Sequence, residues 1–245
     1  MILAIDIGNT SISCGLFRGG RLARRFDLPT ALAASRTGLG RRLEARLAGK
    51  RLERAILCSV VPRVTPVVAG VLRAMHIEVA VVGRDVRVPL VNRYRYPRQV
   101  GHDRLVGAYA AWKAYKHACI VCDFGTAITI DVVTKAGEYL GGVIAPGLDI
   151  SLEALATKTA LLPKVALREP PELLGRDTAN SIRSGLLFGC VALCDGLVTQ
   201  LKRRYAPKAV VVATGGSSAL IAKHARTIDH LRPHLVLEGL SRLAS

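Results

Sequence analysis

One short pattern occurs twice in this chain and limits what the chain can fold into. Residues 6–13 read Asp-Ile-Gly-Asn-Thr-Ser-Ile-Ser, and residues 123–130 read Asp-Phe-Gly-Thr-Ala-Ile-Thr-Ile. Each copy follows an apolar run and precedes a second apolar-rich stretch, which is typical of a strand, a tight turn and a returning strand. A repeated unit of this kind indicates internal duplication. We therefore expect two similar domains.

The segments around the first copy predict an α/β domain. Strands are expected at residues 2–7, 12–18 and 21–28 as an antiparallel meander, followed by a helix over 31–48 that is interrupted around Gly38 and Gly40. A strand at 55–61, a helix at 64–75 and a strand at 77–82 then form a right-handed β-α-β unit. Apolar residues at helical spacing predict a helix from Gly101 to about His117.

The second half repeats this opening. Strands are expected at 119–124, 128–133 and 139–144, then a helix at 151–158, a loop at 163–175 and a long helix at 179–204. A strand at 209–213, a Gly215-Gly216 turn into a helix and a last helix at 237–243 complete the chain. The fold class is α/β with two duplicated domains, each a mixed sheet that opens with an antiparallel meander and is flanked by helices. We place the domains at 1–112 and 113–245.

Composition narrows the class of protein. Half of the residues are hydrophobic, yet we find no uncharged apolar run of about 18 residues, which a membrane span would require. The nearest candidate, residues 185–198, contains Asp195 and is shorter. The first residues show no basic leader or cleavage site. We expect a cytoplasmic protein that has no membrane partner.

The net charge of +17 raises the possibility of nucleic-acid binding. The arginines are spread along the chain, however, and aromatic residues make up only 4% of it, so no set of stacking side chains is evident. We expect no nucleic-acid partner. A solvated basic surface that attracts anionic substrates explains the charge better.

The six cysteines include two close pairs, Cys119 with Cys122 and Cys190 with Cys194, which could suggest a metal site. Residues three apart on a strand point to opposite faces, so the first pair is poorly placed for chelation. Buried free thiols that act as small apolar side chains are the simpler interpretation.

The repeated pattern also suits phosphate chemistry. Gly8 allows a phosphate to approach the backbone, the hydroxyls of Thr10 and Ser11 can donate, and Asp6 can position Mg²⁺. A single Asp-x-Gly-x-Thr is also an ordinary hairpin turn. The second copy at Asp123, and the glycines of Thr214-Gly215-Gly216-Ser217 before a helix, strengthen the nucleotide interpretation. No Gly-x-x-x-x-Gly-Lys-Ser/Thr occurs, and Gly38-Leu39-Gly40 lacks the features of a dinucleotide fingerprint.

Several motifs together resemble type III pantothenate kinase, within the acetate and sugar kinase/Hsc70/actin superfamily, over essentially the whole chain. The motifs are Asp6-Ile-Gly-Asn-Thr, Tyr94 with residues 97–104 (Pro-Arg-Gln-Val-Gly-His-Asp-Arg), Asp123-Phe-Gly-Thr-Ala-Ile-Thr, residues 141–147 (Gly-Gly-Val-Ile-Ala-Pro-Gly), Thr178, and residues 237–240 (Leu-Glu-Gly-Leu). The resemblance implies two ribonuclease H-like, actin-like ATPase-type domains that close on ATP between them. It implies transfer of the ATP γ-phosphoryl group to pantothenate, the first step towards coenzyme A.

The resemblance also assigns residues to roles. Asp103 is implied as the catalytic base, and Asp123 as the ligand of a monovalent cation, K⁺ or NH₄⁺, in addition to Mg²⁺ with ATP. The implied ATP-binding residues are Asp6, Ile7, Gly8, Asn9, Thr10, Ser11, Ile12, Ser13 and Thr126. The implied pantothenate-binding residues are Tyr94, Gly101, His102, Asp103, Arg104 and Thr178. A homodimer is implied because the family pocket is completed across a dimer.

Three positions depart from the family pattern: His102 stands for a usual alanine, Tyr96 for an asparagine and Ile128 for a threonine. Two other functions stay open at this point. One is a related phosphotransferase or phosphohydrolase with another acceptor, and the other is a basic regulatory protein that binds nucleic acid. The pair Asp103-Arg104 could equally be a helix cap with a surface ion pair.

Overall fold

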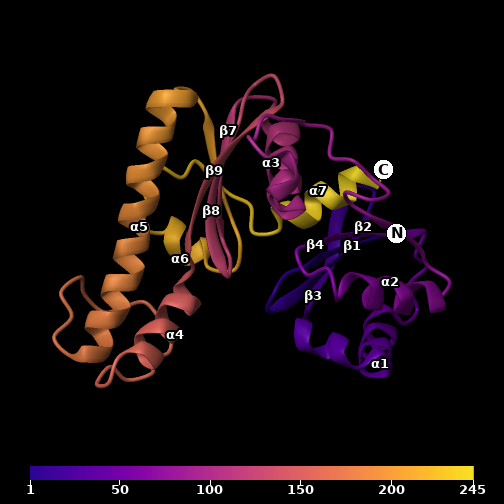
Figure 1. Ribbon diagram of the computed structural model, residues 1–245, viewed down its shortest axis with the longest axis horizontal. Coiled ribbons are helices and arrows are strands. Elements are labelled where there is room, and N and C mark those ends of the chain that lie inside the picture. The colour runs from indigo at the N-terminus through magenta and orange to yellow at the C-terminus, as the bar shows by residue number, and fades with distance from the viewer. Residues whose placement is uncertain (245) are drawn as a thin grey trace. The chain divides into compact units, whose positions relative to one another are not determined.

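The computed structural model describes residues 1–244, which form two compact units (Figure 1). The first unit comprises Met1–Leu90, Arg95–Ala110 and Leu235–Ser245, and the second comprises Val91–Tyr94 and Ala111–His234. The expected domains at 1–112 and 113–245 stay a prediction. The compact units are not continuous in sequence. The C-terminal segment belongs to the first unit, and the four residues Val91–Tyr94 belong to the second.

The first unit is built on a five-stranded sheet of order β3-β2-β1-β4-β5. Its strands are β1 Ile2–Ile7, β2 Ser11–Arg18, β3 Arg21–Pro29, β4 Arg54–Ser59 and β5 Glu78–Val81. The strands β1, β2 and β3 are an antiparallel meander, whereas β4 and β5 run parallel to β1. The helices that belong to this unit wholly or in part are η1 Thr30–Ala34, α1 Arg36–Leu47, α2 Thr65–Ala74, η2 Pro97–Gln99, α3 His102–Tyr115 and α7 Leu235–Leu243.

The second unit is built on a six-stranded sheet of order β11-β10-β7-β8-β9-β6. Its strands are β6 Val91–Asn92, β7 Cys119–Phe124, β8 Ala127–Val133, β9 Glu138–Pro146, β10 Val210–Thr214 and β11 His230–Leu231. Again three antiparallel strands, β7, β8 and β9, are joined by parallel strands, β10 and β11. Its helices are α4 Leu148–Lys158, α5 Thr178–Tyr205 and α6 Ser218–Ala222.

The predicted α/β duplication is confirmed by this topology. The order β3-β2-β1-β4-β5 corresponds to β9-β8-β7-β10-β11, with β6 added at one edge. The gapless alignment of the two motifs is wrong after the turn, however. Ile7 pairs with Ile12 in the first unit, whereas Phe124 pairs with Ile128 in the second, so the second turn is one residue shorter.

Both faces of the first sheet are covered, which explains why β1 is apolar along nearly its whole length. Leu3, Ile5 and Ile7 pack with α1 and α2 on one face. Ala4 faces the opposite side, together with Ile56 of β4 and side chains of α3 and α7. Alternate residues of a strand point to opposite faces, so a strand between two helical layers must be apolar throughout.

The expected interruption of the helix at Gly38 and Gly40 is wrong, because α1 is continuous there. Gly38 and Gly40 lie inside α1, and the break falls at Ser35, which separates η1 from α1. The Ser35 hydroxyl accepts a hydrogen bond from the Gly38 amide at 3.0 Å, so this serine caps the new helix. Capping chemistry decided the boundary here more than glycine propensity did.

Helix α5 spans 28 residues along one face of the second sheet (Figure 1). Its buried side packs with strand residues such as Ile130. This side consists of Leu187, Cys190, Cys194 and Val198. Among the described residues it is the one helix that is long and apolar enough, by length and composition, to cross a membrane, and 33% of the most apolar window is buried. The sequence had predicted no such candidate. Buried core helices of soluble proteins meet the same criterion, and α5 packs on a sheet.

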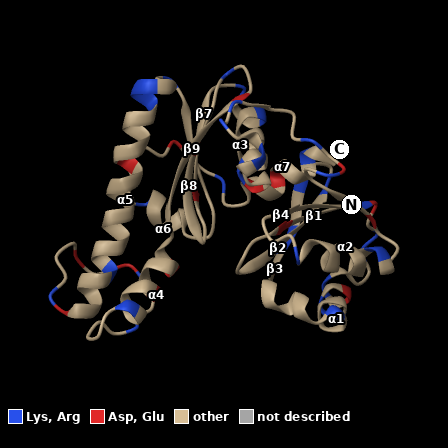
Figure 2. Cartoon of the chain, in the orientation of Figure 1, with Lys and Arg blue, Asp and Glu red and all other residues tan. Residues whose placement is uncertain are grey.

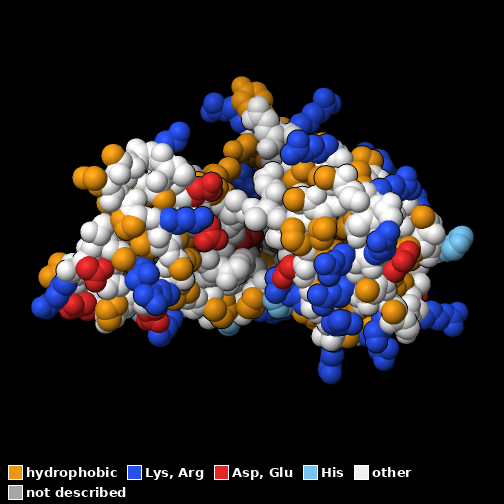
Figure 3. Space-filling view, turned by 90° about the horizontal axis from the view of Figure 1, so that it is seen from below, with side chains coloured by type: hydrophobic (Ala, Val, Ile, Leu, Met, Phe, Trp, Pro, Cys, Tyr) orange, Lys and Arg blue, Asp and Glu red, His pale blue; other side chains and the backbone are white. Residues whose placement is uncertain are grey.

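Charged side chains are distributed over many elements (Figure 2). The last turn of α5 carries Lys202, Arg203 and Arg204, where positive charge complements the helix dipole. On the face drawn in Figure 3, Lys and Arg side chains are scattered among apolar and neutral ones rather than gathered into one patch. All six cysteines are buried and free, as predicted.

Candidate active site

The first Asp-x-Gly turn lies at the carboxyl end of β1. Asp6 is opposite Ser13 of β2 and Cys58 of β4. The Gly8 amide donates to the Ser11 carbonyl at 2.9 Å and closes the turn. A Cβ on Gly8 would lie 3.3 Å from that same oxygen, which is tighter than most side-chain contacts, so glycine suits this position.

Thr30 makes two hydrogen bonds to this turn, and the sequence did not predict this role. Its hydroxyl donates to the Gly8 carbonyl at 2.7 Å, and its amide donates to the Thr10 carbonyl at 3.0 Å. Thr30 is only 7% exposed. A hydroxyl directly after Pro29, at the end of a predicted strand, was the available signal, but its partner could only be known from the tertiary structure.

The predicted ATP-binding residues of this turn differ in what they present. Asn9, Thr10 and Ser11 are exposed. The side chains of Ile7 and Ile12 are buried in the core, so these two can offer only backbone groups to a ligand. The Ser13 hydroxyl donates to Asp27 at 2.8 Å.

Two predicted substrate-binding residues, Asp103 and Arg104, lie at the start of α3 in the first unit. Helix α3 begins at His102, directly after Gly101, and Asp103 lies in its first turn. Asp103 accepts a hydrogen bond from the Arg104 amide at 2.8 Å. A Cβ on Gly101 would collide with the Asp103 carboxylate, so glycine leaves the room that this carboxylate occupies.

Asp6 and Asp103 both lie near the buried thiol of Cys58. Burial raises the pKa of this thiol well above its usual value, and the negative charges of Asp6 and Asp103 raise it further. Asp6 of β1 lies directly opposite Cys58 of β4 in the parallel pairing of these strands. Ligands of α/β proteins commonly bind outside the carboxyl ends of parallel strands, and β1 and β4 are parallel here.

His102, which departs from the family pattern, packs against the loop after β5. Its imidazole ring fills the place where a side chain on Gly83 would stand. Gly83 has a φ of +87°, a conformation that favours glycine. The larger residue at 102 is thus accommodated by a glycine at 83.

In the second unit, three backbone turns lie close to one another along the segment 123–126. The turn after β7 passes through Gly125 and Thr126, and the Gly147 amide at the start of α4 donates to the Thr126 carbonyl at 3.2 Å. Gly215, after β10, has a φ of +93°, and a Cβ there would collide with the Asp123 carboxylate and the Phe124 backbone. The predicted glycine site at 215 therefore lies beside the second Asp-x-Gly turn.

The Asp123 carboxylate lies close to two glycine positions, Gly125 and Gly215. Its Oδ1 would be 3.5 Å from a Cβ placed on Gly125, and the carbonyls of Gly125 and Thr126 are crowded against Gly147. Within residues 1–244 no group of three or more His, Cys, Asp or Glu side chains could hold a metal ion. One carboxylate with backbone carbonyls and a hydroxyl is instead the donor set of a hard cation such as K⁺. The chemistry of these residues suits the predicted cation, and its binding at Asp123 stays a prediction.

Ile128 lies in the apolar core of the second unit and is 4% exposed. A threonine at this position would place its hydroxyl in that core, so the departure at 128 exchanges one buried side chain for another.

The other predicted substrate residues of this unit lie at two places. Tyr94 packs on Gly141, whose Cβ would come 3.0 Å from its ring. Thr178 is the first residue of α5 and lines an apolar cavity of about 310 Å³ with Leu155, Leu162 and Ile182, between α4 and α5. The described contacts do not join Thr178 to Tyr94 or Asp123.

Two sheets of one repeated topology, each with an Asp-x-Gly turn after its first strand, form the duplicated α/β architecture that the sequence resemblance implies. A family profile described as type III pantothenate kinase matches residues 2–200. A type III pantothenate kinase from Moorella thermoacetica is 38% identical over 246 residues, with 98% of this chain and 97% of that protein covered. The chain belongs to the type III pantothenate kinase family.

Solved structures agree with the fold. A protein from Campylobacter jejuni described as a Baf family transcriptional activator aligns with a TM-score of 0.61 at 19% identity, covering 98% of this chain and 96% of that one. Component A of (R)-2-hydroxyglutaryl-CoA dehydratase from Acidaminococcus fermentans aligns with a TM-score of 0.53 at 13% identity, covering 99% and 95%. At such identities the likeness concerns the fold alone.

Proposed function

We propose that this chain transfers the γ-phosphoryl group of ATP to the primary hydroxyl of pantothenate and so makes 4'-phosphopantothenate, the first step of coenzyme A biosynthesis. Membership of the type III pantothenate kinase family over residues 2–200 is the observation that carries the proposal. The kinases of this family use ATP together with Mg²⁺. Both Asp-x-Gly turns, which suit phosphate binding, are present in the chain.

Asp103 acts as the base in the proposed reaction. The hydroxyl oxygen of pantothenate forms a bond to the γ-phosphorus, the bond from that phosphorus to the β–γ bridging oxygen breaks, and ADP leaves. The hydroxyl proton passes to the Asp103 carboxylate. A loose transition state asks for late proton transfer and orientation more than for strong basicity. The place of Asp103 in the first turn of α3, directly after Gly101, supports this role.

The nucleotide is held by the first turn in this proposal. The exposed Asn9, Thr10 and Ser11 donate to its phosphates, Ile7, Gly8 and Ile12 contribute backbone groups, and Ser13 supports the turn through Asp27. Thr126 supplies a further hydroxyl. Mg²⁺ bound with ATP would offset the charge of Asp6 and of the phosphates.

Pantothenate is an anion, and the start of α3 suits an anion. The amides at Gly101 and His102 open a helix N-terminus, where negative charge is favoured, and Arg104 adds a guanidinium. We place Tyr94 and Thr178 against the rest of the substrate. Asp123 holds the monovalent cation, K⁺ or NH₄⁺.

The setting of the enzyme is also proposed rather than established. We expect a cytoplasmic homodimer that binds neither nucleic acid nor a membrane. The scattered arrangement of Lys and Arg in Figure 3 supports a solvated surface more than a nucleic-acid groove.

The reaction can be tested by measuring ADP and phosphopantothenate together, with mass spectrometry for the product. We expect one phosphopantothenate for each ADP, and no ADP when pantothenate is left out. ADP formed without any acceptor would indicate a phosphohydrolase. A folded protein that makes no phosphopantothenate with K⁺ or NH₄⁺ present would overturn the proposed substrate.

A further inference from the structure

A four-residue segment of the chain is attached to the second sheet in an unusual way. Val91–Tyr94 belongs to the second unit, although the residues on both sides of it belong to the first. Its strand β6 is only two residues long and pairs with the start of β9. The Val91 amide donates to the Gly137 carbonyl and the Arg93 amide to the Tyr139 carbonyl, each at 2.9 Å.

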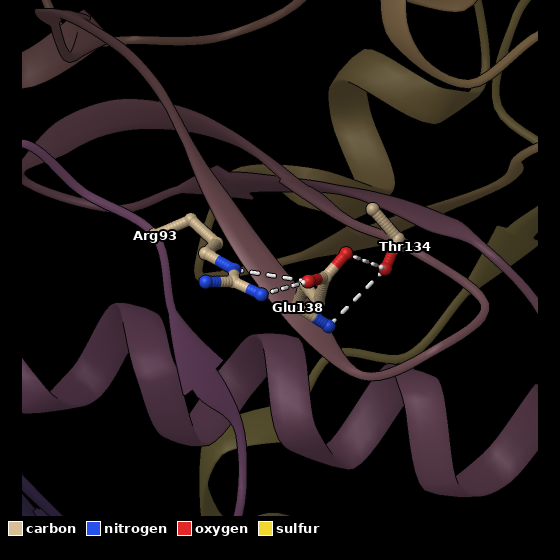
Figure 4. Close-up of polar contacts among 3 residues, drawn as sticks. All are labelled: Arg93, Thr134 and Glu138. Carbon is tan, nitrogen blue, oxygen red and sulfur yellow. Dashed lines mark hydrogen bonds and ion pairs between the residues drawn. The ribbon is translucent and has the colours of Figure 1, made fainter.

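An ion pair reinforces this short pairing (Figure 4). Nε and Nη2 of Arg93 both donate to Oε1 of Glu138, at 2.9 and 2.7 Å. Thr134 also contacts Glu138. Its hydroxyl accepts a hydrogen bond from the Glu138 amide at 3.2 Å and lies 3.5 Å from Oε2 of the carboxylate. The Glu138 side chain is 29% exposed and that of Arg93 61%. The acidic partner is thus held more firmly than an ordinary surface side chain.

The segment ends at Tyr94, and its geometry fixes where that ring lies. The Tyr94 amide donates to the Asn92 side chain at 3.0 Å, which turns the chain directly after β6. The ring then lies over Gly141, whose φ of +119° and missing side chain leave room for it. It is also tilted against Tyr139, with ring centroids 6.4 Å apart.

We infer that Arg93 and Glu138 are positioning residues for the acceptor substrate, because their ion pair docks Val91–Tyr94 on β9 and thereby sets the orientation of Tyr94. The inference rests on the proposed function, in which Tyr94 contacts pantothenate. A two-residue strand at the edge of a sheet is a weak attachment on its own. If the ion pair is lost, the ring must be ordered when substrate binds, and this cost weakens binding.

Charge reversal tests the pair rather than either residue alone. The variants Arg93→Glu and Glu138→Arg each place like charges together, and the double variant restores opposite charges in exchanged positions. We expect each single variant to raise KM for pantothenate about three- to fivefold, the range of an exposed ion pair, with kcat and KM for ATP unchanged. The double variant should recover KM to within about twofold of the parent.

The single tryptophan of the chain reports on whether the hairpin formed by β8 and β9 is intact. Trp112 packs on Gly137, and its indole Nε1 donates to the Lys135 carbonyl at 3.0 Å, at the turn between β8 and β9. Its emission should be the same in all variants. Amide hydrogen exchange in a peptide containing Val91–Tyr94 should be faster in the single variants only, because the Val91 and Arg93 amides donate to the carbonyls of Gly137 and Tyr139.

A matched control is Lys202→Ala, which removes another ion pair of the same unit, Lys202 with Asp229 at 3.7 Å. Its KM for pantothenate should equal that of the parent. Unchanged KM and unchanged exchange in both single variants of an active enzyme would overturn the inference and leave the proposed function standing. So would a double variant no better than the singles. A parent that makes no phosphopantothenate would overturn both.

Discussion

At the scale of single residues, the negative charge of Asp123 lies where three turns of the second unit come together. A Cβ on Gly215 would collide with this carboxylate, and a Cβ on Gly147 would collide with the carbonyls of Gly125 and Thr126. The Asp123 carboxylate is the proposed ligand of the monovalent cation.

Replacing Asp123 by asparagine should therefore weaken cation binding while keeping the shape of the side chain. We expect the K⁺ concentration needed for half-maximal activity to rise about tenfold or more, the equivalent of about 1.4 kcal/mol. Activity titrated with K⁺ measures this. The control is Asp149→Asn, an exposed carboxylate in the first turn of α4, whose K⁺ dependence should match the parent. The same K⁺ dependence in both variants would argue against Asp123 as the ligand.

Sequence patterns predicted which residues form the turns, but they did not predict the contacts that stabilise those turns. Asp6, Gly8 and Asp123 were predicted because strand, turn and glycine signals are local. Thr30 was missed, since its hydrogen bond to Gly8 joins residues 22 positions apart. The packing of His102 on Gly83 was equally hidden, because nothing local indicates which backbone a side chain will cover.

At the scale of elements, α7 is the part of the chain whose place could not be read from its own sequence. The helix was expected, but its packing on β1, β4 and α3 in the first unit depends on contacts with residues far back in the chain. Leu235, Leu237 and Leu240 are almost fully buried there. Burial of each such side chain contributes about 1.5–3 kcal/mol. The two-residue β6 was missed for the same reason, since it is defined only by its partner β9.

Two glycine-to-alanine changes separate packing from helix propensity. In α7, a Cβ at Gly239 would lie 2.7 Å from both Val106 Cγ1 and the Val106 carbonyl oxygen, so Gly239→Ala should destabilise the protein by about 1–3 kcal/mol. In α5, Gly196 has open space around it, and Gly196→Ala should raise stability by up to about 1 kcal/mol. Denaturant unfolding measures both. Equal effects of the two changes would contradict the close packing of α7.

At the scale of the whole molecule, the proposed homodimer must form between chains that each carry +17 charges. Like charges repel, and salt screens the repulsion, with a Debye length of about 10 Å at 0.1 M and about 3 Å at 1 M. Association should therefore strengthen as salt is raised.

Sedimentation equilibrium tests this directly. We expect a species of twice the 26.2 kDa chain mass, with a monomer fraction that falls between low and high salt. Activity at protein concentrations below the dimer dissociation constant should fall in parallel. A fully active monomer at every salt concentration would contradict the proposed assembly.

The family and the duplicated fold were predictable because they depend on patterns that recur along the chain. The Asp-x-Gly motif appears twice, and the sheets that carry it have corresponding strand orders. The interleaving of the units was not predictable, since it is set by where α7 and the Val91–Tyr94 segment pack.

Phosphopantothenate formation by Asp103→Asn, compared with the parent, is the most direct test of the proposed reaction. Asparagine keeps the size of the side chain, so pantothenate should still bind, as measured by calorimetry, whereas kcat should fall by about 10²- to 10⁴-fold because the proton acceptor is gone. A variant that keeps kcat within about tenfold of the parent would contradict the role of Asp103 as the catalytic base.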